Sequence, residues 1–427
     1  MAASSKKDKT LKKIAIIGSG ISGMTAAYLL NKKHNITLFE KDSRLGGHTA
    51  TIDVDTPEGN IAVDTGFIVF NDRTYPLFEK LLDEINVGRN PTQMSFSVKT
   101  AERDFEYNGH TFASLFAQKR NILSFKFWHF LYNIVKFNRI AKALYHSGDY
   151  SEHKNLGEFL DAHGFDDFFK SHYILPMGAA IWSTSLKGML DFEIQFFIRF
   201  FYNHGLLDVA GRPQWYVIPG GSKQYIAPLT QSYKNNIRLN ADIKRVTRES
   251  EGVEIVFEGG TVERFDEVVF ACHSDQALAL LADATELEQE ILGSIEYTPN
   301  SVVLHTDTNL LPKRTAAWAS WNYLLDEGQT RPATVTYQMN ILQKLECNQQ
   351  FCVTLNNDEH IAPEKIIQKF EYFHPVFNTR SIAAQKRKNE VDGVKKTFFC
   401  GAYWFNGFHE DGVRSAVDVA KKLGVEF

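Results

Sequence analysis

The sequence has few cysteines, no long apolar run and no excess of basic charge, and each of these absences excludes a class of protein. Its 427 residues include 4 cysteines and no CxxC pair, so we expect neither a metal site nor a disulfide scaffold. No stretch reaches about eighteen uninterrupted apolar residues, which excludes an obvious transmembrane helix. A net charge of -4 argues against nucleic-acid binding. The polar start, MAASSKKDKTLKK, lacks a signal-peptide core, and we expect a cytoplasmic protein.

The length and the aromatic content indicate an enzyme-sized chain with apolar pockets. A chain of 427 residues is long for one hydrophobic core and favours two domains. The 33 phenylalanines exceed what ordinary cores require, which favours apolar binding surfaces as well.

A glycine-rich turn near the N-terminus predicts a dinucleotide site. The apolar run KIAIIG is typical of a buried parallel strand, and GSGISG follows it, with Gly18, Gly20, Ser22 and Gly23. In this strand-turn-helix setting the glycines permit a tight turn, a close approach of backbone to a pyrophosphate, and close helix packing. The second strand, NITLFE, ends in Glu40, where a carboxylate accepts the ribose hydroxyls and disfavours a 2'-phosphate.

The next residues indicate which dinucleotide binds. Arg44 and the pair Gly46-Gly47, with His48 beside them, resemble the extended RxGG motif of the flavin-containing amine oxidase superfamily, which holds FAD as a resident prosthetic group. Asp64 and Gly66 match the acid-x-glycine turn by which that superfamily leads toward the flavin. An exposed hairpin also explains such a turn, and both readings stay open. Simple NAD dehydrogenases lack the RxGG motif.

The cofactor domain is predicted to be discontinuous. Gly220-Gly221 precede a helix, several alternating strands follow, and Asp266–Leu281 reads as a buried strand running into a helix. Val246 falls where the superfamily's strand meets the adenine. We therefore predict a cofactor domain of residues 1–75, 212–292 and 395–427, and a substrate domain of residues 76–211 and 293–394.

A long segment of the substrate domain contains no acidic residue. Residues 107–148 combine lysines and arginines with Phe, Trp, Leu and Ile, as expected for a basic, aromatic, amphipathic helix. Such a helix suits peripheral contact with an anionic membrane, or the binding of a lipid carboxylate. The other interpretation, which the commonness of surface helices favours, is a helix that packs its aromatic face inward and leaves its lysines in water.

Longer strings extend the resemblance over the whole chain after about Lys12. DTGFIVFNDRTYPLF, GRPQW, AWASWN and FCGAYWFNGFHEDG are similar to one branch of the superfamily. This branch comprises free-standing bacterial NAD/FAD-binding proteins, whose relatives form the N-terminal flavoprotein region of plant cyclopropane-fatty-acid synthases. The resemblance implies an α/β fold with a Rossmann-like FAD-binding domain plus a mixed α+β substrate domain, as in amine oxidases and p-hydroxybenzoate hydroxylase. It also implies a lipid-like substrate.

Three positions depart from the superfamily's pattern. Gly401 is followed by Ala402, where many members have an acid that holds the ribityl chain. Asn300-Ser301 stand where amine oxidases commonly keep a lysine bonded through water toward the flavin. Phe408 lacks the hydroxyl of the usual tyrosine in the amine cage. These departures disfavour an ordinary amine oxidase.

The sequence therefore predicts a FAD-dependent oxidoreductase that dehydrogenates or isomerises a fatty-acyl or other apolar substrate. Asp411, Gly412 and Val413 are expected at the start of the last helix, whose N–H groups can face the flavin. The candidates for catalysis are His409, Phe408, Tyr403, Trp182 and Trp318. A structural hydrogen-bonding role is an equal interpretation of His409. Two other functions stay open, an amine oxidase that uses O2 and a flavin-bearing accessory subunit of a fatty-acyl-modifying enzyme.

Overall fold

The chain forms two compact units. The computed structural model describes residues 11–100, 104–208, 211–326 and 332–427. Unit 1 comprises Met1–Gly47, Tyr225–Ile295 and Ala383–Phe427, and unit 2 comprises His48–Gln224 and Glu296–Ile382. Residues 48–75 and 212–224, which we assigned from the sequence to the cofactor domain, thus belong to unit 2, and 383–394 belong to unit 1. The expectation about a signal peptide concerns residues 1–10, which lie outside the described residues.

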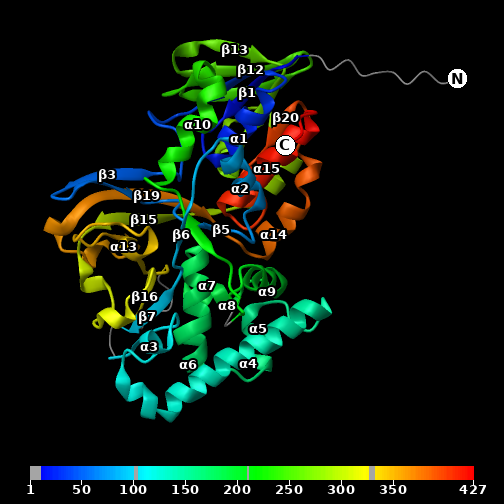
Figure 1. The fold of residues 1–427 in the computed structure, drawn as a ribbon. Helices are drawn as coiled ribbons and strands as arrows, with labels where there is room; N and C mark the ends of the chain where they lie inside the picture. Colours follow the sequence, from blue (N-terminus) through cyan, green and yellow to red (C-terminus); the bar gives the residue numbers. More distant parts are fainter. Residues whose placement is uncertain (1–10, 101–103, 209–210, 327–331) are drawn as a thin grey trace. The chain divides into compact units, whose positions relative to one another are not determined.

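Unit 1 is built on a five-stranded parallel sheet in the order β10-β2-β1-β14-β20 (Figure 1). Its central strands are apolar and buried on both faces, as a parallel sheet requires. Helices α1 and α15 pack against each other. The bounds are β1 Lys13–Ile17, α1 Ile21–Leu30, β2 Asn35–Phe39, α10 Ile226–Thr230, β10 Ile237–Arg238, β14 Glu267–Phe270, α11 Ser274–Leu280, α12 Glu286–Leu292, β20 Thr397–Phe399 and α15 His409–Lys422.

A second sheet of unit 1 is antiparallel. It contains β11 Ile243–Glu249, β12 Gly252–Phe257 and β13 Val262–Phe265 in sequence order. These are the alternating strands expected from the sequence, and the predicted strand and helix at 266–281 correspond to β14 and α11. Helix α14, Thr379–Lys386, spans the boundary between the units.

Unit 2 contains a seven-stranded mixed sheet in the order β19-β15-β18-β17-β16-β7-β8. Two small sheets, β3-β4 and β5-β9-β6, accompany it. The strand bounds are β3 Thr51–Thr56, β4 Gly59–Asp64, β5 Phe70–Asn71, β6 Asn90–Thr92, β7 Phe96–Thr100, β8 Glu106–Asn108, β9 Trp215–Val217, β15 Tyr297–His305, β16 Trp321–Leu325, β17 Val335–Gln338, β18 Cys352–Leu355 and β19 Ile366–Pro375.

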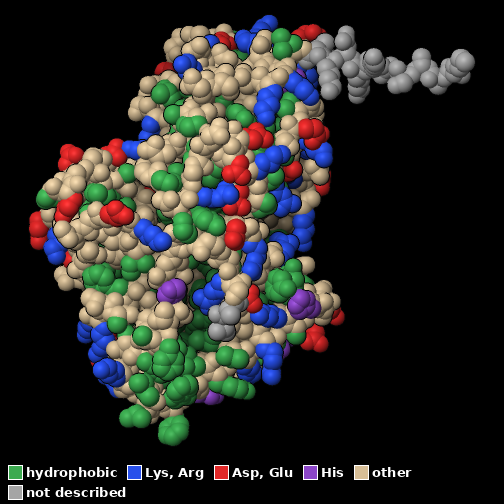
Figure 2. Space-filling model, in the orientation of Figure 1, with side chains coloured by type: hydrophobic (Ala, Val, Ile, Leu, Met, Phe, Trp, Pro, Cys, Tyr) green, Lys and Arg blue, Asp and Glu red, His purple; other side chains and the backbone are tan. Residues whose placement is uncertain are grey.

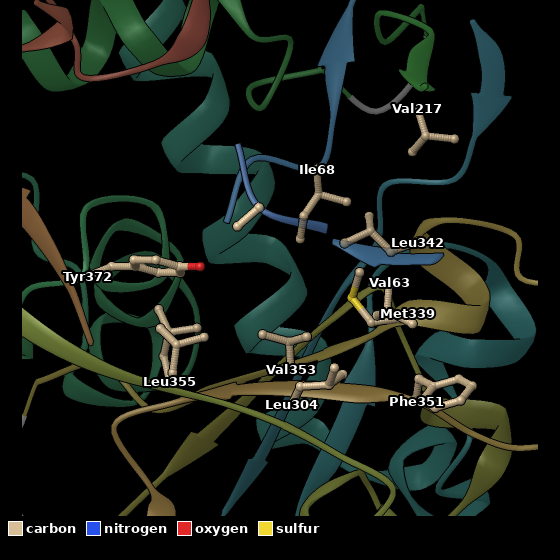
Figure 3. Packing of buried hydrophobic residues seen from close by; sticks show 12 residues of the cluster. Val63, Ile68, Val217, Leu304, Met339, Leu342, Phe351, Val353, Leu355 and Tyr372 are labelled. Carbon is tan, nitrogen blue, oxygen red and sulfur yellow. The ribbon is translucent and has the colours of Figure 1, made fainter. Parts of the chain in front are cut away.

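The main core of unit 2 lies on one face of this sheet. Side chains of β15 and β18, among them Leu304 and Val353, meet Val63 of β4 and Met339 of α13, Met339–Leu342 (Figure 3). These side chains are fully or almost fully buried, and burial of each stabilises the fold by about 1.5–3 kcal/mol. The core holds β3 and β4 firmly against the large sheet.

Helices form the remainder of unit 2. The acid-free segment contains the helix expected there, α4, which begins after a Ser124 cap and ends at Gly148 in a left-handed conformation. The segment LKGMLDFEIQFFIRFFYN, which contains five phenylalanines, forms α8 and α9. The remaining helix bounds are α2 Pro76–Glu84, α3 Phe112–Leu115, α4 Phe125–Ser147, α5 Leu156–Ala162, α6 Asp167–Phe169, α7 Leu175–Trp182, α8 Leu186–Leu190 and α9 Ile194–Asn203.

The segment AWASWN is only partly a strand. Thr315–Ala317 form a 3-10 turn, and β16 begins only at Trp321. Trp318 therefore precedes the strand that contains Trp321. The indole of Trp318 donates to the Pro312 carbonyl at 2.8 Å, and the Trp318 carbonyl accepts from Asn108 at 2.8 Å, so both groups belong to a loop.

Two features are absent from the described residues. None of their helices is both long and apolar enough to cross a membrane. Within the same ranges, no group of three or more His, Cys, Asp or Glu side chains is placed to hold a metal ion.

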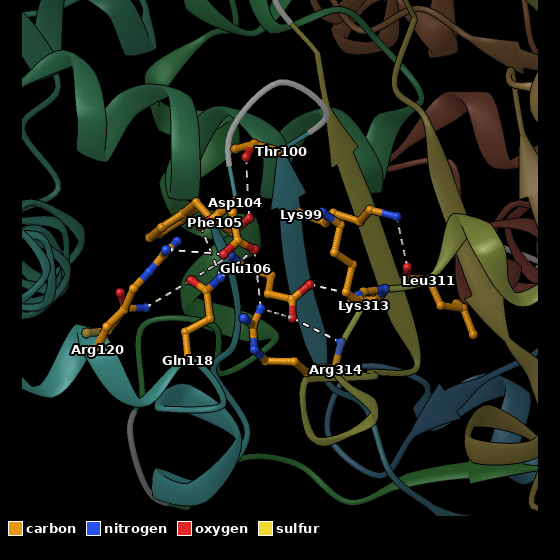
Figure 4. A network of polar contacts seen from close by, with 12 residues as sticks. Lys99, Thr100, Asp104, Phe105, Glu106, Gln118, Arg120, Leu311, Lys313 and Arg314 are labelled. Atoms are coloured by element: carbon orange, nitrogen blue, oxygen red, sulfur yellow. Dashed lines mark hydrogen bonds and ion pairs between the residues drawn. The ribbon is translucent and has the colours of Figure 1, made fainter.

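A buried carboxylate joins β8 to the loop before β16 (Figure 4). Glu106, 2% exposed, accepts from the backbone N–H groups of Lys313 at 2.8 Å and Arg314 at 3.0 Å. It also accepts from the Arg314 guanidinium at 2.9 Å. Asp104 contacts Arg314 and Arg120 at 3.3 and 3.2 Å but lies at the surface. Because Glu106 is buried and Asp104 is exposed, the hydrogen bonds of Glu106 contribute more to the free energy of unfolding than the ion pairs of Asp104.

We expect Glu106→Ala to lower the melting temperature by roughly 6 °C or more, because three donors lose their acceptor in a dry site. Asp104→Ala, a matched control on the same arginine, should lower it by less than about 2 °C, since exposed ion pairs contribute little. Differential scanning fluorimetry of both variants measures the difference. Equal shifts would contradict the assignment of Glu106 as the anchor of this loop.

Candidate functional site

The turn after β1 is fixed by steric contacts that only glycine permits. Gly18 has φ +105°, and a Cβ there would lie 2.8 Å from the Ala271 carbonyl oxygen. A Cβ on Gly23 would lie 1.9 Å from the Gly18 carbonyl oxygen. Both glycines are therefore required by the protein's own packing, which brings the start of α1 close to the ends of β1 and β14.

Gly20 differs from its neighbours because a Cβ there would meet nothing within 4 Å. It precedes α1 without a side-chain cap, so the first N–H groups of this helix have no side-chain acceptor from the capping residue. An open backbone surface at a helix N-terminus suits a phosphate group. The structure thus offers the cradle that a pyrophosphate needs beside Gly20.

Glu40 is held beside this loop. One carboxylate oxygen accepts from the backbone N–H of Ser19 at 2.9 Å, and the other accepts from Asp42 N–H at 2.9 Å. The carboxylate therefore faces the glycine-rich turn from the end of β2. Its position fits the expected acceptor for ribose hydroxyls.

The RxGG segment packs on the first glycine loop. Gly46 N–H donates to the Ser19 carbonyl at 3.1 Å, and a Cβ on Gly47 would lie 3.3 Å from the Gly20 Cα. Arg44 is exposed, and its guanidinium donates to the Gly47 carbonyl at 2.9 Å. The two predicted glycine motifs thus form one continuous backbone surface in unit 1, where the residues present fit a dinucleotide.

The start of α15 lies against the start of α1. A Cβ on Gly412 would lie 2.6 Å from Ile21 Cγ2 and 2.9 Å from Ser22 Oγ, so glycine allows the two helix starts to meet. Asp411 accepts from the N–H groups of Phe408 at 2.9 Å and Asn406 at 3.2 Å. Burial raises the pKa of Asp411 to about 7. Gly412 N–H donates within the helix to the Phe408 carbonyl, and the buried Val413 follows it.

His409 is tied to a buried tyrosine. Its Nε2 lies 3.0 Å from the Tyr225 hydroxyl, and the two rings meet edge to face with centroids 6.1 Å apart. This contact gives His409 a structural role in unit 1. A catalytic role for it stays a prediction.

The remaining predicted residues of unit 1 are packed into its interior. Val246 is fully buried in β11 and bridges to Leu281. Tyr403 is buried, stacks near Trp404 and covers Gly401, where a Cβ would lie 2.2 Å from the Tyr403 ring. No ligand role of these residues follows from that packing.

Asp64 is a hub of unit 2. Its carboxylate accepts from Ser222 N–H at 2.9 Å, Ser222 Oγ at 2.8 Å and Gln343 Nε2 at 2.9 Å, besides Thr51 Oγ1. Burial raises its pKa to about 6 despite these donors. These hydrogen bonds hold the carboxylate within unit 2. A direct hydrogen bond between Asp64 and a ligand stays a prediction.

The Asp64–Gly66 turn wraps around His48. A Cβ on Gly66 would lie 2.0 Å from the His48 carbonyl oxygen, and Phe67 N–H donates to that oxygen at 2.8 Å. Between them, the Thr65 hydroxyl lies 3.0 Å from the Tyr372 hydroxyl. The His48 ring lies 5.1 Å from the Tyr372 ring, centroid to centroid. The predicted acid-x-glycine turn therefore serves to place His48.

Sequence reasoning missed the polar cluster that surrounds His48. We define the histidine cluster as His48, Ser183, Asn300, Tyr372 and His374. The rings of His48 and His374 have centroids 5.6 Å apart, and Ser183 Oγ lies 3.0 Å from His374 Nδ1. Ser183 ends α7 in the left-handed region, φ +52°, which is strained for a residue with a side chain.

The hydrogen bonds of Asn300 and Asn356 fix the tautomer of His374. Because the Ala333 carbonyl can only accept, Asn356 Nδ2 is oriented as the donor, and it also donates to Asn300 Oδ1 at 2.9 Å. Asn300 Nδ2 then faces His374 Nδ1 at 3.3 Å and must donate. His374 Nδ1 is therefore an acceptor, and the ring proton lies on Nε2. Burial, with a smaller contribution from His48, lowers the pKa of His374 to about 3.

The sequence carried one weak signal for this cluster. In FEYFHP, Tyr372 and His374 are two residues apart and share a face of β19, and Asn300 lies opposite Tyr372 in β15. Only the pairing of two strands about seventy residues apart brings these groups together.

The two predicted tryptophans lie in different surroundings. Trp182 is 7% exposed, directly precedes Ser183, and packs on Phe192 and Phe200 with ring centroids 4.5 and 4.8 Å away. Its indole N–H has no hydrogen-bond partner within the described part of the chain. Trp318 lies in the loop before β16. Its indole N–H and its carbonyl hydrogen-bond to Pro312 and Asn108, which are not members of the histidine cluster.

Comparisons with known proteins agree with this fold. The family model described as flavin containing amine oxidoreductase matches residues 21–348. The structure of a CLA-producing fatty acid isomerase from P. acnes is 15% identical with a TM-score of 0.68, covering 97% of this chain and 99% of that one. Cyclohexylamine oxidase from Brevibacterium oxydans IH-35A is 14% identical with a TM-score of 0.69 over the same shares.

A third structure, a putative protoporphyrinogen oxidase from Exiguobacterium sp. 255-15, is 16% identical with a TM-score of 0.67. It covers 97% of this chain and 98% of that one. At these identities the solved structures establish the fold alone. The two-domain α/β fold expected from the sequence is confirmed.

We expect Gly20→Ala to fold normally and to lose bound flavin, because its Cβ would point into open space that a pyrophosphate must approach. Gly88→Ala is the matched control, since a Cβ there also meets nothing within 4 Å but the residue belongs to unit 2 and to neither glycine motif. The ratio of visible flavin absorbance to protein absorbance measures the effect. Full flavin content in a folded Gly20→Ala protein would refute the cradle.

Proposed function

Because the chain belongs to the flavin-containing amine oxidoreductase family and its cofactor is FAD, we propose that it acts on a fatty-acyl or similarly apolar substrate. The enzyme is a flavin oxidoreductase or isomerase. A fatty acid isomerase and an amine oxidase both have this fold, so the fold does not identify the substrate. The proposal therefore concerns the substrate class.

The residues that would hold FAD are those of the fused glycine motifs in unit 1. Gly20 and the first turn of α1 would receive the pyrophosphate, and Glu40 would accept the ribose hydroxyls. Arg44 is placed on the same surface and could exchange its contact with Gly47 for one with phosphate. When bound, FAD supplies hydride acceptance and return.

The histidine cluster carries the proposal about the substrate. Its five side chains are two imidazoles, a phenol, a hydroxyl and an amide, so the cluster contains no carboxylate. The pKa of His374 is lowered to about 3, which keeps that ring neutral at ordinary pH. An amine substrate is a cation and is best bound where negative charge compensates it, whereas a cluster without a carboxylate suits a substrate that carries no positive charge.

The direction of the hydrogen bonds gives the cluster a chemical role. With Nδ1 occupied by Ser183 and Asn300, His374 presents an N–H donor at Nε2. A donor of this kind can orient a carbonyl or carboxylate head group, or hold a proton during a rearrangement of double bonds. Trp182, beside Ser183, adds a buried N–H and an aromatic face.

Aromatic packing next to the cluster also favours an apolar substrate. Helix α9 contributes Phe196, Phe197 and Phe200 around Trp182, with ring centroids 4.8–6.0 Å from the indole. Aromatic side chains form the apolar lining typical of small-molecule sites. This surrounding is consistent with a hydrocarbon chain and offers no charge to an amine.

Anaerobic titration of the FAD-loaded protein with free fatty acids, phospholipids and amines tests the substrate class. We expect an unsaturated acyl substrate to bleach the flavin, or to be converted to an isomer that chromatography of the products detects. Bleaching by amines alone, with hydrogen peroxide formed on admission of air, would support an amine oxidase instead. A flavoprotein inert toward every lipid and amine, but active with a fatty-acyl-modifying partner, would support the accessory-subunit alternative.

We expect His374→Gln to lower turnover of that acyl substrate by roughly a hundredfold, because an amide, unlike an imidazole, cannot give up and regain a proton at ordinary pH. Flavin content should stay unchanged. His360→Gln, at an exposed histidine of the same unit, is the control. The lowered pKa of His374 also makes its contribution to folding stability decline as pH falls from about 6.5 toward 3, since only the unfolded state takes up the proton. Full activity in His374→Gln would exclude this role.

A further inference from the structure

Helix α4 and the segment before it expose a contiguous apolar surface. Leu123 is 87% exposed, Phe125 93% and Phe112 72%. We define the aromatic patch as these residues together with the other exposed apolar side chains of the segment, namely Ile122, Trp128, Tyr132 and Val135. Figure 2 shows hydrophobic side chains gathered over α3 and the N-terminal half of α4. Apolar patches of this kind mark interaction surfaces.

The helix is apolar on two opposite faces. Phe127, Phe130 and Phe137 are buried inside unit 2, as the sequence led us to expect. The outer face repeats apolar residues at helical spacing from Phe125 to Val135, where a surface helix normally carries polar side chains. Packing within unit 2 therefore does not explain the apolar residues on the outer face of α4.

The patch is held in shape by its own contacts. Phe112 and Phe116 have ring centroids 4.7 Å apart, and Phe116 and Trp128 have theirs 5.5 Å apart. The Trp128 indole donates to the Ile122 carbonyl at 2.8 Å. These contacts join α3, the 3-10 turn Lys119–Leu123 and α4 into one surface, so the exposure does not result from loose side chains.

Basic side chains border the patch. Lys119, Lys126 and Arg139 are exposed and make no ion pair within the described residues, and residues 107–148 contain no Asp or Glu. The carboxylates that pair with basic side chains of residues 107–148 therefore belong to other segments of the chain. Asp104 pairs with Arg120 at 3.2 Å, Asp166 with His129 at 3.0 Å, and Asp208 with Lys142. The unpaired charges at the rim are thus positive.

We propose that the aromatic patch docks on an anionic phospholipid membrane. Leu123, Phe125 and Trp128 would enter the boundary between head groups and acyl chains, and Lys119, Lys126 and Arg139 would contact the phosphates. Aromatic residues with a polar atom, such as Trp128 and Tyr132, suit that boundary. A second copy of the chain fits less well, since a two-fold contact through this patch brings two positive rims together.

This proposal goes beyond the proposed reaction and does not depend on it. It rests on the exposure and charge of a surface in unit 2, whereas the reaction rests on the histidine cluster and the glycine motifs. Membrane binding can therefore fail while acyl turnover stands, or hold while every acyl substrate is inert.

Vesicle flotation of the FAD-loaded protein tests the proposal. We expect it to float with vesicles of phosphatidylcholine and phosphatidylglycerol, less with phosphatidylcholine alone, and less at high salt. Leu123→Ser/Phe125→Ser should lower the bound fraction at least tenfold without loss of flavin, because both side chains are exposed. Val262→Ser/Val394→Ser, at exposed apolar side chains of unit 1, is the matched control and should bind normally.

Two further measurements complete the test. Lys119→Glu/Lys126→Glu should abolish the preference for anionic vesicles. Sedimentation velocity of the protein without vesicles should show no self-association that depends on Leu123 and Phe125. Absence of vesicle binding, binding that survives Leu123→Ser/Phe125→Ser, or a dimer that this variant dissociates would each overturn the proposal.

Discussion

Close approach of backbone to backbone at glycine organises both units of this protein. In unit 1, Gly23 packs so tightly on the Gly18 carbonyl that a Cβ would lie 1.9 Å away, and the start of α1 can take no other position relative to β1. In unit 2, Gly66 packs on the His48 carbonyl with a corresponding distance of 2.0 Å. Neither contact tolerates even alanine, so a nucleotide cradle and a histidine are positioned by sterics before any ligand binds.

The sequence could predict the features that depend on residues close together along the chain. Gly18, Gly20, Gly23 and Glu40 lie within one strand-turn-helix-strand segment, where spacing alone determines which atoms meet, and they indicated a dinucleotide. The fold class and FAD, which the family resemblance implied, are confirmed. The acid-free helix could be predicted for the same reason. Its outward apolar face could not, because the sequence shows that aromatic residues alternate around a helix but not which side is covered.

The histidine cluster could not be predicted, because four distant segments assemble it, one of which contains His48. Ser183 ends α7, Asn300 lies in β15 and His374 in β19, and their contacts follow from a strand pairing that no local pattern specifies. The contrast with His409 is instructive. Its place beside a glycine-rich helix start drew attention to it, and the contact with Tyr225 shows a structural role, while its catalytic role stays a prediction.

Asn300 shows why a departure from a family pattern can be chemically coherent. A lysine at this position would bring a cation toward His48 and His374 and would require a counter-charge. The amide of Asn300 adds no charge. Asn356 donates to the Ala333 carbonyl and to the amide oxygen of Asn300, so the amide nitrogen of Asn300 must donate to His374. It thereby fixes the proton of His374 on Nε2 while the ring stays neutral. Under the proposed function, asparagine rather than lysine at this position therefore suits a substrate that needs only an oriented donor.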